Sequence, residues 1–251
     1  MDKTNLEELM NAPQQKWDTL ANKKIYFGHQ SVGYNIVEGI QEIIANNPNI
    51  KLNIKVAKNP SDFNAPVFAH SPVGKNRDPF TKIADFKAIM DSGVGRKVDI
   101  AFFKLCYIDI DQDTDLDRLF NYYKENMRQI QENYPNAIFI HCSVPVRTTN
   151  TSIKAAIMRL LGKTVWGDKE NIARNKYNQK LANEYGSSGR FFDLAKYEAT
   201  SPNGALTHCA KDGKDCLALY SKYSEDGGHL SSLGRKAVST KLLWLIFHLL
   251  S

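Results

Sequence analysis

The sequence predicts an α/β fold with a mostly parallel sheet and helices on both of its faces. Strand-like and helix-like segments alternate along all 251 residues, which is the pattern of βαβ units. Hydrophobic residues make up 42% and charged residues 24%, so an ordinary globular core is expected. We find no internal repeat, low-complexity tract or linker, and therefore predict one domain over residues 1–251.

The first segments are predicted to be helix, strand, helix and strand in turn. An amphipathic leader helix is expected over Asn5–Ala21, within residues 1–22, and Pro13 marks a start or a break in it. The apolar run Lys23–Gly28 suits a buried first strand. Gly33–Ala45 carries apolar residues at helical spacing, whereas Asn49–Ala57 alternates apolar and polar residues as a strand does.

The middle of the chain continues the alternation after a loop. Asn59–Pro79 contains prolines, asparagines and a glycine, and is predicted to be irregular. Phe80–Met90 is expected to be a helix, and Val98–Leu105 a central parallel strand because it is mostly apolar, apart from Asp99 and Lys104. A long helix over Leu116–Tyr134 and a strand over Ala137–Val144 follow.

The last third contains two less regular segments. Asn150–Gly167 is predicted to be an insertion with one short helix, followed by a helix over Lys169–Tyr185 and a strand over Arg190–Leu194. Residues 201–224 form a polar loop insertion. The chain is expected to close with an amphipathic helix over Leu230–Leu250.

Charge and hydropathy argue against two classes of partner. The net charge of +6 comes from 33 basic and 27 acidic residues that are scattered rather than clustered, so no nucleic-acid partner is expected. The longest apolar run, Leu242–Leu250, is far shorter than the roughly 20 residues that span a bilayer. The polar start leaves a cytoplasmic protein or one whose export signal has been removed. The oligomeric state is left open.

The four cysteines fall into two pairs. Cys106 and Cys142 end apolar runs and are expected to be buried thiols. Cys209 and Cys216 flank a short polar loop, for which a disulfide ranks first, free thiols second and a metal clip with His208 third. A disulfide there would favour a periplasmic or extracellular location. We predict neither a metal nor an organic cofactor.

Polar residues follow several of the predicted strands. Ser31, the loop around Gly74, the segment Cys106–Asp109 and the stretch after Val144 all do so. Because parallel strands point their carboxyl ends to one edge of the sheet, these residues are expected to share that edge, where α/β proteins bind ligands.

Ser31 lies between two glycines on a sharp strand-to-helix turn, in the sequence Gly28-His29-Gln30-Ser31-Val32-Gly33. Its backbone N–H, at the start of a helix, offers half of an oxyanion hole. Its hydroxyl is a nucleophile if a base reaches it. The alternative is a plain helix cap, a common role of serine.

Asp226-Gly227-Gly228-His229 precedes the last predicted helix. A histidine can serve as the base for a serine, and a nearby carboxylate can hold its ring in the useful tautomer. The alternative is a helix cap by Asp226 next to a surface His229.

At these residues the chain resembles the SGNH/GDSL hydrolases, a superfamily of esterases and lipases with a flavodoxin-like three-layer α/β/α sandwich. The resemblance rests on a first strand that leads through Phe27-Gly28 to Ser31, and on Asp226-x-x-His229-Leu230 followed by Ser-x-x-Gly. It implies that Ser31 is the nucleophile, His229 the general base and Asp226 the residue that orients it.

Two departures from the family pattern concern the oxyanion hole. The first block is one residue longer than Gly-Asp-Ser, and Cys106-Tyr107-Ile108-Asp109 lacks the glycine and asparagine usual after the central strand. We expect two substitute donors beside the Ser31 amide, both from the loop after the second strand: the Gly74 amide and the Asn76 side chain. Both are also ordinary turn residues.

Four further residues are predicted to line the substrate site: His29, Gln30, Lys104 and Tyr107. The leading hypothesis is a serine esterase that hydrolyses small acyl esters, with acetyl groups on carbohydrate favoured by the resemblance alone. The alternatives are a non-catalytic module that binds glycans or a protein partner on the same fold, and an acyltransferase that uses the same triad.

Overall fold

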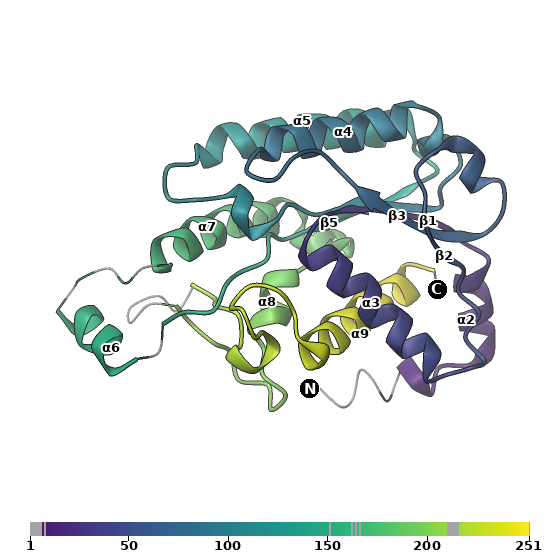
Figure 1. Cartoon of the computed structure of the whole chain (residues 1–251). Coiled ribbons are helices and arrows are strands. Elements are labelled where there is room, and N and C mark those ends of the chain that lie inside the picture. Colours follow the sequence, from purple (N-terminus) through teal and green to yellow (C-terminus); the bar gives the residue numbers. More distant parts are fainter. Residues whose placement is uncertain are drawn as a thin grey trace.

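The computed structural model describes residue 7 and residues 9–150, 152–161, 163, 165, 167–209 and 216–250. Six parallel strands form one sheet in the order β2-β3-β1-β4-β5-β6. Leaving the short edge strand β2 aside, the order is the 2-1-3-4-5 arrangement of doubly wound sheets. With helices on both faces, the molecule is the three-layer α/β/α sandwich that the sequence predicts (Figure 1).

The helices and strands of the described chain are as follows: α2 Gln14–Ala21, β1 Lys24–His29, α3 Val32–Ala45, β2 Ile54–Val56, β3 Val67–Pro72, α4 Pro79–Asp91, β4 Ile100–Phe103, η3 Tyr107–Asp109, α5 Leu116–Asn133, β5 Ile138–Cys142, α6 Ile153–Leu160, α7 Asp168–Tyr185, β6 Phe191–Phe192, α8 Leu194–Ala199 and α9 Ser232–Leu249.

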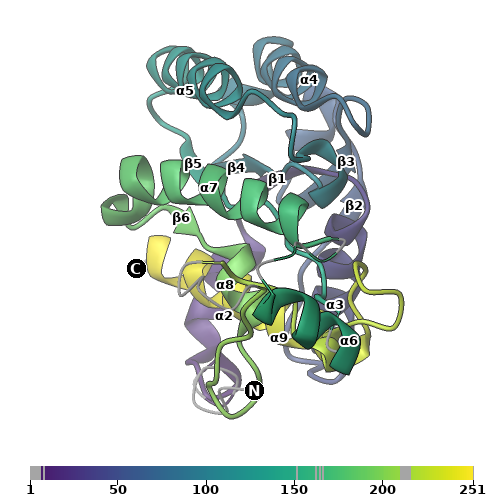
Figure 2. The same ribbon diagram turned by 90° about the vertical axis from the view of Figure 1, so that its left-hand side faces the viewer.

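The side chains of alternate strand residues pack into two separate hydrophobic cores, one on each face of the sheet. In β1, Ile25 and Phe27 pack with α2, α3 and α9, whereas Tyr26 packs with α4, α5 and α7. This is the period of two that a strand imposes on its side chains. Figures 1 and 2 accordingly show α4 and α5 on one side of the sheet and α2, α3 and α9 on the other.

Strand β3 is the main element that the sequence analysis missed. Val67–Pro72 lies within the segment predicted to be a loop, because prolines flank it and only its first three residues are apolar. The strand is nevertheless buried in the sheet, and its polar side chains find partners on β1. The Ser71 hydroxyl pairs with Tyr26 Oη at 2.7 Å, and His70 Nδ1 pairs with His29 Nε2 at 3.0 Å. Satisfied polar groups can therefore sit in a central strand.

Other boundaries differ less from the prediction. Strand β2 keeps only three of the nine residues expected to form it, and α8 was not foreseen. Helix α2 begins directly after Pro13; of the leader helix, residues 1–6 and 8 lie outside the described residues.

Cys209 and Cys216 form the expected disulfide, and Cys106 and Cys142 are buried free thiols. Residues 210–215, which this disulfide encloses, lie outside the described residues. Within the described ranges, no helix combines the length and the apolar character that crossing a bilayer requires.

The packing of α3 against α9 brings the two ends of the chain together. The two helices lie side by side on one face of the sheet, and the Ser239 hydroxyl donates to the Ile36 carbonyl at 2.8 Å between them. At their beginnings, the Leu230 amide donates to the Asn35 side-chain oxygen at 3.0 Å. The residues before α3 and before α9 therefore meet although they are almost 200 positions apart.

Candidate active site

The site lies where the strand order of the sheet changes direction. Strands β1 and β4 are neighbours, and the helices that follow them, α3 and α5, cover opposite faces of the sheet. A crevice opens at the carboxyl ends of two such strands, and ligands of doubly wound proteins bind there. Ser31 follows β1, and Tyr107 follows β4.

Ser31 occupies a turn position that favours glycine. Its φ is +54° and its ψ is −118°, and the Gly33 amide donates to the Gln30 carbonyl at 3.0 Å to close the turn around it. A side chain in such a conformation stores about 1–3 kcal/mol of strain, which is typical of functional sites. The Ser31 hydroxyl makes no hydrogen bond to the first turn of α3, so it does not cap the helix as the alternative interpretation required.

This strain predicts a difference between two variants of the same residue. The free energy of unfolding of Ser31→Gly should exceed that of Ser31→Ala by about 1 kcal/mol, because only glycine adopts this φ without strain. Ser31→Gly should accordingly melt at the higher temperature. Thermal or urea unfolding of both purified variants measures the difference. Equal stabilities would mean that the turn relaxes around alanine.

The Ser31 hydroxyl lies 2.8 Å from His229 Nε2, and His229 Nδ1 lies 2.5 Å from Asp226 Oδ2. The other Asp226 oxygen accepts from the Gly228 and His229 amides at 2.8 and 2.7 Å. Partial desolvation raises the pKa of Asp226, but the hydrogen bonds from His229 and Gly228 lower it more, and the net pKa lies well below its usual range. Asp226 is therefore an ionised acceptor behind the imidazole.

The loop that carries Asp226 and His229 is held by residues of the segment that follows β5. The Arg147 guanidinium donates to the carbonyls of Asp226 and Gly227 at 3.3 Å, and the Thr148 amide donates to the same Gly227 carbonyl at 3.0 Å. Gly227 has a φ of +81°, which explains the glycine there. Helix α9 is capped by Ser231, so Asp226 is not its cap. The sequence pointed to the stretch after Val144 but did not single out Arg147.

The structure does not support the predicted role of Gly74 as an oxyanion donor. The Gly74 amide donates to the Asp85 carboxylate of α4 at 2.9 Å, while its carbonyl accepts from Gln30. The amide therefore already has a charged partner on the helix. Asn76 is exposed, and its side-chain oxygen accepts from the buried Lys82 amine at 2.8 Å. The oxyanion role of its amide nitrogen stays a prediction.

Three of the four predicted substrate-lining residues have structural partners instead. His29 is fully buried against His70, and burial together with the Lys104 charge lowers its pKa to about 2. Lys104 is also buried, with its amine near the Leu105 carbonyl and the Cys106 thiol at 3.4 and 3.3 Å. Substrate contact is therefore wrong for His29 and Lys104. The Gln30 amide joins β1 to β3 by donating to the Val73 and Gly74 carbonyls.

Glu198, on α8, holds the segment that carries Arg147. The sequence analysis did not identify it, because α8 was not predicted. Its carboxylate is fully buried and accepts from the Val146 amide at 2.8 Å, next to Arg147. Its other oxygen is buried without a partner among the described residues. Desolvation raises the pKa of Glu198 from 4.5 to about 8, against the opposing hydrogen bond from Val146 and the charges of Lys104 and Arg174.

This raised pKa predicts how stability depends on pH. The folded protein keeps the Glu198 proton up to about pH 8, while the unfolded chain releases it near pH 4.5, so stability falls as pH rises between these values. Glu198→Gln needs no such proton. Its melting temperature should exceed that of the wild type by about 3 °C or more at pH 8.5, with a smaller advantage at pH 5. The exposed Glu132→Gln is the control, and a pH-independent difference for Glu198→Gln would contradict the assignment.

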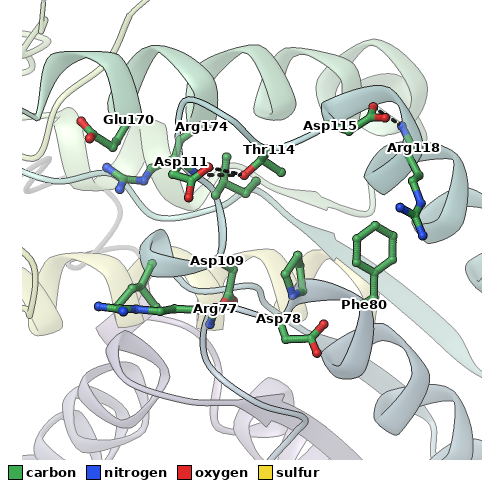
Figure 3. Close-up of a pocket in the computed structure, with 13 residues that line it drawn as sticks. Arg77, Asp78, Phe80, Asp109, Asp111, Thr114, Asp115, Arg118, Glu170 and Arg174 are labelled. Atoms are coloured by element: carbon green, nitrogen blue, oxygen red, sulfur yellow. Dashed lines mark hydrogen bonds between the residues drawn. The ribbon is translucent and has the colours of Figure 1, made fainter.

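A cavity of about 510 Å³ lies beyond η3, within the size range of small-molecule sites. Figure 3 shows Arg77, Arg174 and Glu170 toward one end of it, and the Arg118 guanidinium beside Phe80 at the other. None of Ser31, Asp226 and His229 lines this cavity. Arg174 connects the two places, because it lines the cavity and donates to the Tyr107 carbonyl at 2.7 Å.

No protein-family model matches the sequence, and no curated protein matches it significantly. Solved structures with a similar fold include a proposed platelet activating factor from Streptococcus pneumoniae, with 16% identity and a TM-score of 0.49, over 95% of this chain and 94% of that one. A proposed lipolytic protein of the G-D-S-L family from Desulfitobacterium hafniense DCB-2 has 9% identity and a TM-score of 0.46, over 89% and 99%.

The periplasmic domain of a lipopolysaccharide acetyltransferase from Salmonella ser. Paratyphi A has 14% identity and a TM-score of 0.44, over 88% of this chain and 83% of that one. At these identities and TM-scores, the similarities assign no residue, substrate or reaction to this chain.

Proposed function

We propose that the protein is a serine esterase that hydrolyses small acyl esters through Ser31, His229 and Asp226. The observation that carries the proposal is the hydrogen-bonded series from the Ser31 hydroxyl through both ring nitrogens of His229 to the Asp226 carboxylate. A nucleophile, its base and the base's orienting group in this order are the minimum that acyl transfer by serine needs. The strained φ of Ser31 adds support, because strain of this kind collects at functional residues.

In the proposed reaction, Ser31 Oγ attacks the acyl carbonyl while His229 Nε2 accepts the hydroxyl proton. The carbonyl π electrons move to its oxygen, which the Ser31 amide stabilises at the start of α3. Asp226 holds the imidazole and stabilises its cation. His229 then gives the proton to the leaving alcohol, and water releases the acid from the acyl-enzyme by the reverse sequence.

The substrate is proposed to be an ester of a hydroxyl-rich alcohol, with acetylated carbohydrate as the favoured class. His229 and Asp226 are about half exposed, so the triad is open to a large substrate. The neighbouring cavity offers carboxylates and guanidinium groups for hydroxyls, and an aromatic ring at Phe80. The preference for acetyl groups rests on the resemblance described in the sequence analysis.

Turnover of a substrate series tests the proposal. The purified protein is incubated with p-nitrophenyl acetate, butyrate and octanoate and with acetylated xylan, and the released acid is quantified. We expect acid from the acetate esters, with the rate falling as the acyl chain lengthens. Acid release only after addition of a sugar acceptor, as an acylated product, would identify a transferase. Binding of the polysaccharide with no turnover of any ester by folded protein would overturn the proposal in favour of a binding module.

A further inference from the structure

The oxyanion hole needs a donor besides the Ser31 amide, and Tyr107 is placed to supply it. Tyr107 is half-buried at the start of η3, directly beyond the carboxyl end of β4, and β4 is the neighbour of the strand that precedes Ser31. The Gly74 amide, which the sequence suggested for this role, is bound to Asp85. Tyr107 carries a hydroxyl on the β4 side of the triad, and its ring lies near that of His229.

The backbone and ring of Tyr107 are held firmly. Its carbonyl accepts from Arg174 Nε at 2.7 Å. The guanidinium groups of Arg147 and Arg174 lie 5.3 and 5.8 Å from the ring centroid, within range of cation–π attraction. A ring anchored in this way loses little conformational freedom when it donates to a reacting atom, and such preorganisation is what makes an oxyanion donor effective.

The hydroxyl end of the ring points to the triad. A Cβ placed on Gly228 would lie 2.9 Å from Tyr107 Oη, so the phenol packs on the residue before His229, and the missing side chain of Gly228 makes room for it. The ring centroid lies 5.9 Å from that of His229. The hydroxyl therefore lies against the loop that carries His229, the hydrogen-bond partner of Ser31.

The phenol is also in the right protonation state. Desolvation raises the pKa of Tyr107, the Arg147 charge lowers it and the Asp226 charge raises it, and the net shift is upward. Tyr107 thus keeps its proton in neutral solution, where an anion would repel an oxyanion. A neutral phenol in a partly desolvated place donates a strong hydrogen bond to a negative oxygen.

We propose that the Tyr107 hydroxyl is the second oxyanion donor of the site. When the Ser31 Oγ–carbon bond forms, the π pair of the carbonyl becomes the oxyanion, which accepts hydrogen bonds from the Tyr107 hydroxyl and the Ser31 amide. The Tyr107 O–H bond stays intact, and the Ser31 proton goes to His229. This inference rests on the proposed esterase function.

Tyr107→Phe tests the inference, because it removes the hydroxyl and keeps the ring between the arginines and Gly228. The expected result is a fall in kcat of about 100-fold with KM within about twofold of wild type, since the donor acts mainly on the transition state. A trifluoromethyl ketone, whose adduct with serine carries an oxyanion, should bind more weakly by a similar factor. Tyr122→Phe, on exposed α5 beside Phe80, is the matched control and should match the wild type.

The outcomes separate the two proposals. If Tyr107→Phe keeps wild-type kcat and inhibitor affinity while Ser31→Ala is inactive, Tyr107 is a packing residue and the esterase proposal stands. A large loss of kcat in Asn76→Ala instead would return the role to the loop after β3. If the wild type neither turns over esters nor reacts with the ketone, the function itself is wrong. The inhibitor affinity is measured on folded protein, so a change in stability cannot imitate the expected result.

Discussion

Ser31→Ala is expected to lower kcat/KM for p-nitrophenyl acetate by about 10⁴-fold or more, because no other described group at the site can form the acyl-enzyme. His229→Ala should cost about as much, since an uncharged hydroxyl is a poor nucleophile. The double variant should be no worse than either single one, because the two groups act as one unit. Initial rates of p-nitrophenyl acetate hydrolysis, corrected for the rate without enzyme, are measured for the two single variants and the double variant.

Two conservative controls accompany these variants. Ser61→Ala changes an exposed serine near β3, and His248→Ala changes an exposed histidine on α9 that bonds the Trp244 carbonyl. Both should keep wild-type rates. Activity in Ser31→Ala above one tenth of the wild-type rate would exclude Ser31 as the nucleophile, and losses that simply add in the double variant would argue against a shared proton transfer.

Asp226→Asn is expected to lower kcat by about 10⁴-fold while leaving the fold intact. An asparagine side chain can still accept from the Gly228 and His229 amides, so the loop should keep its shape. The asparagine has no negative charge to place next to His229 Nδ1. Its amide nitrogen would turn toward Nδ1 as a donor, so the ring is no longer held in the tautomer that leaves Nε2 free to take the Ser31 proton. The imidazolium also loses its counter-charge.

The measurement for Asp226→Asn is kcat alongside circular dichroism and the melting temperature. Wild-type kcat in this variant would show that the imidazole needs no carboxylate, and the triad would reduce to a serine–histidine pair. A fall in kcat accompanied by loss of the folded signal would instead assign Asp226 a structural role at the start of α9.

The sequence predicted the site better at the ends of the chain than in its middle. Ser31 and His229 stand in short segments bounded by glycines, between elements with a clear period, so β1, α3 and α9 could be placed around them. Strand β3 could not be predicted, because His70 and Ser71 read as loop residues until their partners on β1 are known. The Gly74 role failed for the same reason, since it depended on Asp85, whose side-chain direction no local pattern reveals.

Long-range contacts also explain the remaining differences. Lys104 is buried because the Leu105 carbonyl and the Cys106 thiol accept its hydrogen bonds. Its position at the end of an apolar segment does not predict these partners. Glu198 and Arg174 act on the site from helices far along the chain. Tyr107 was expected to contact substrate, but its packing against Gly228 and near the His229 ring depends on residues more than 100 positions away in the sequence.

The most direct test of the account is covalent labelling of the native protein with a fluorophosphonate, followed by intact-mass measurement and peptide mapping. We predict a single adduct on Ser31, formed in the wild type and absent or much slower in His229→Ala and Asp226→Asn. No adduct on folded wild-type protein, or an adduct on a residue other than Ser31, would contradict the claim that Ser31 is a nucleophile activated by His229.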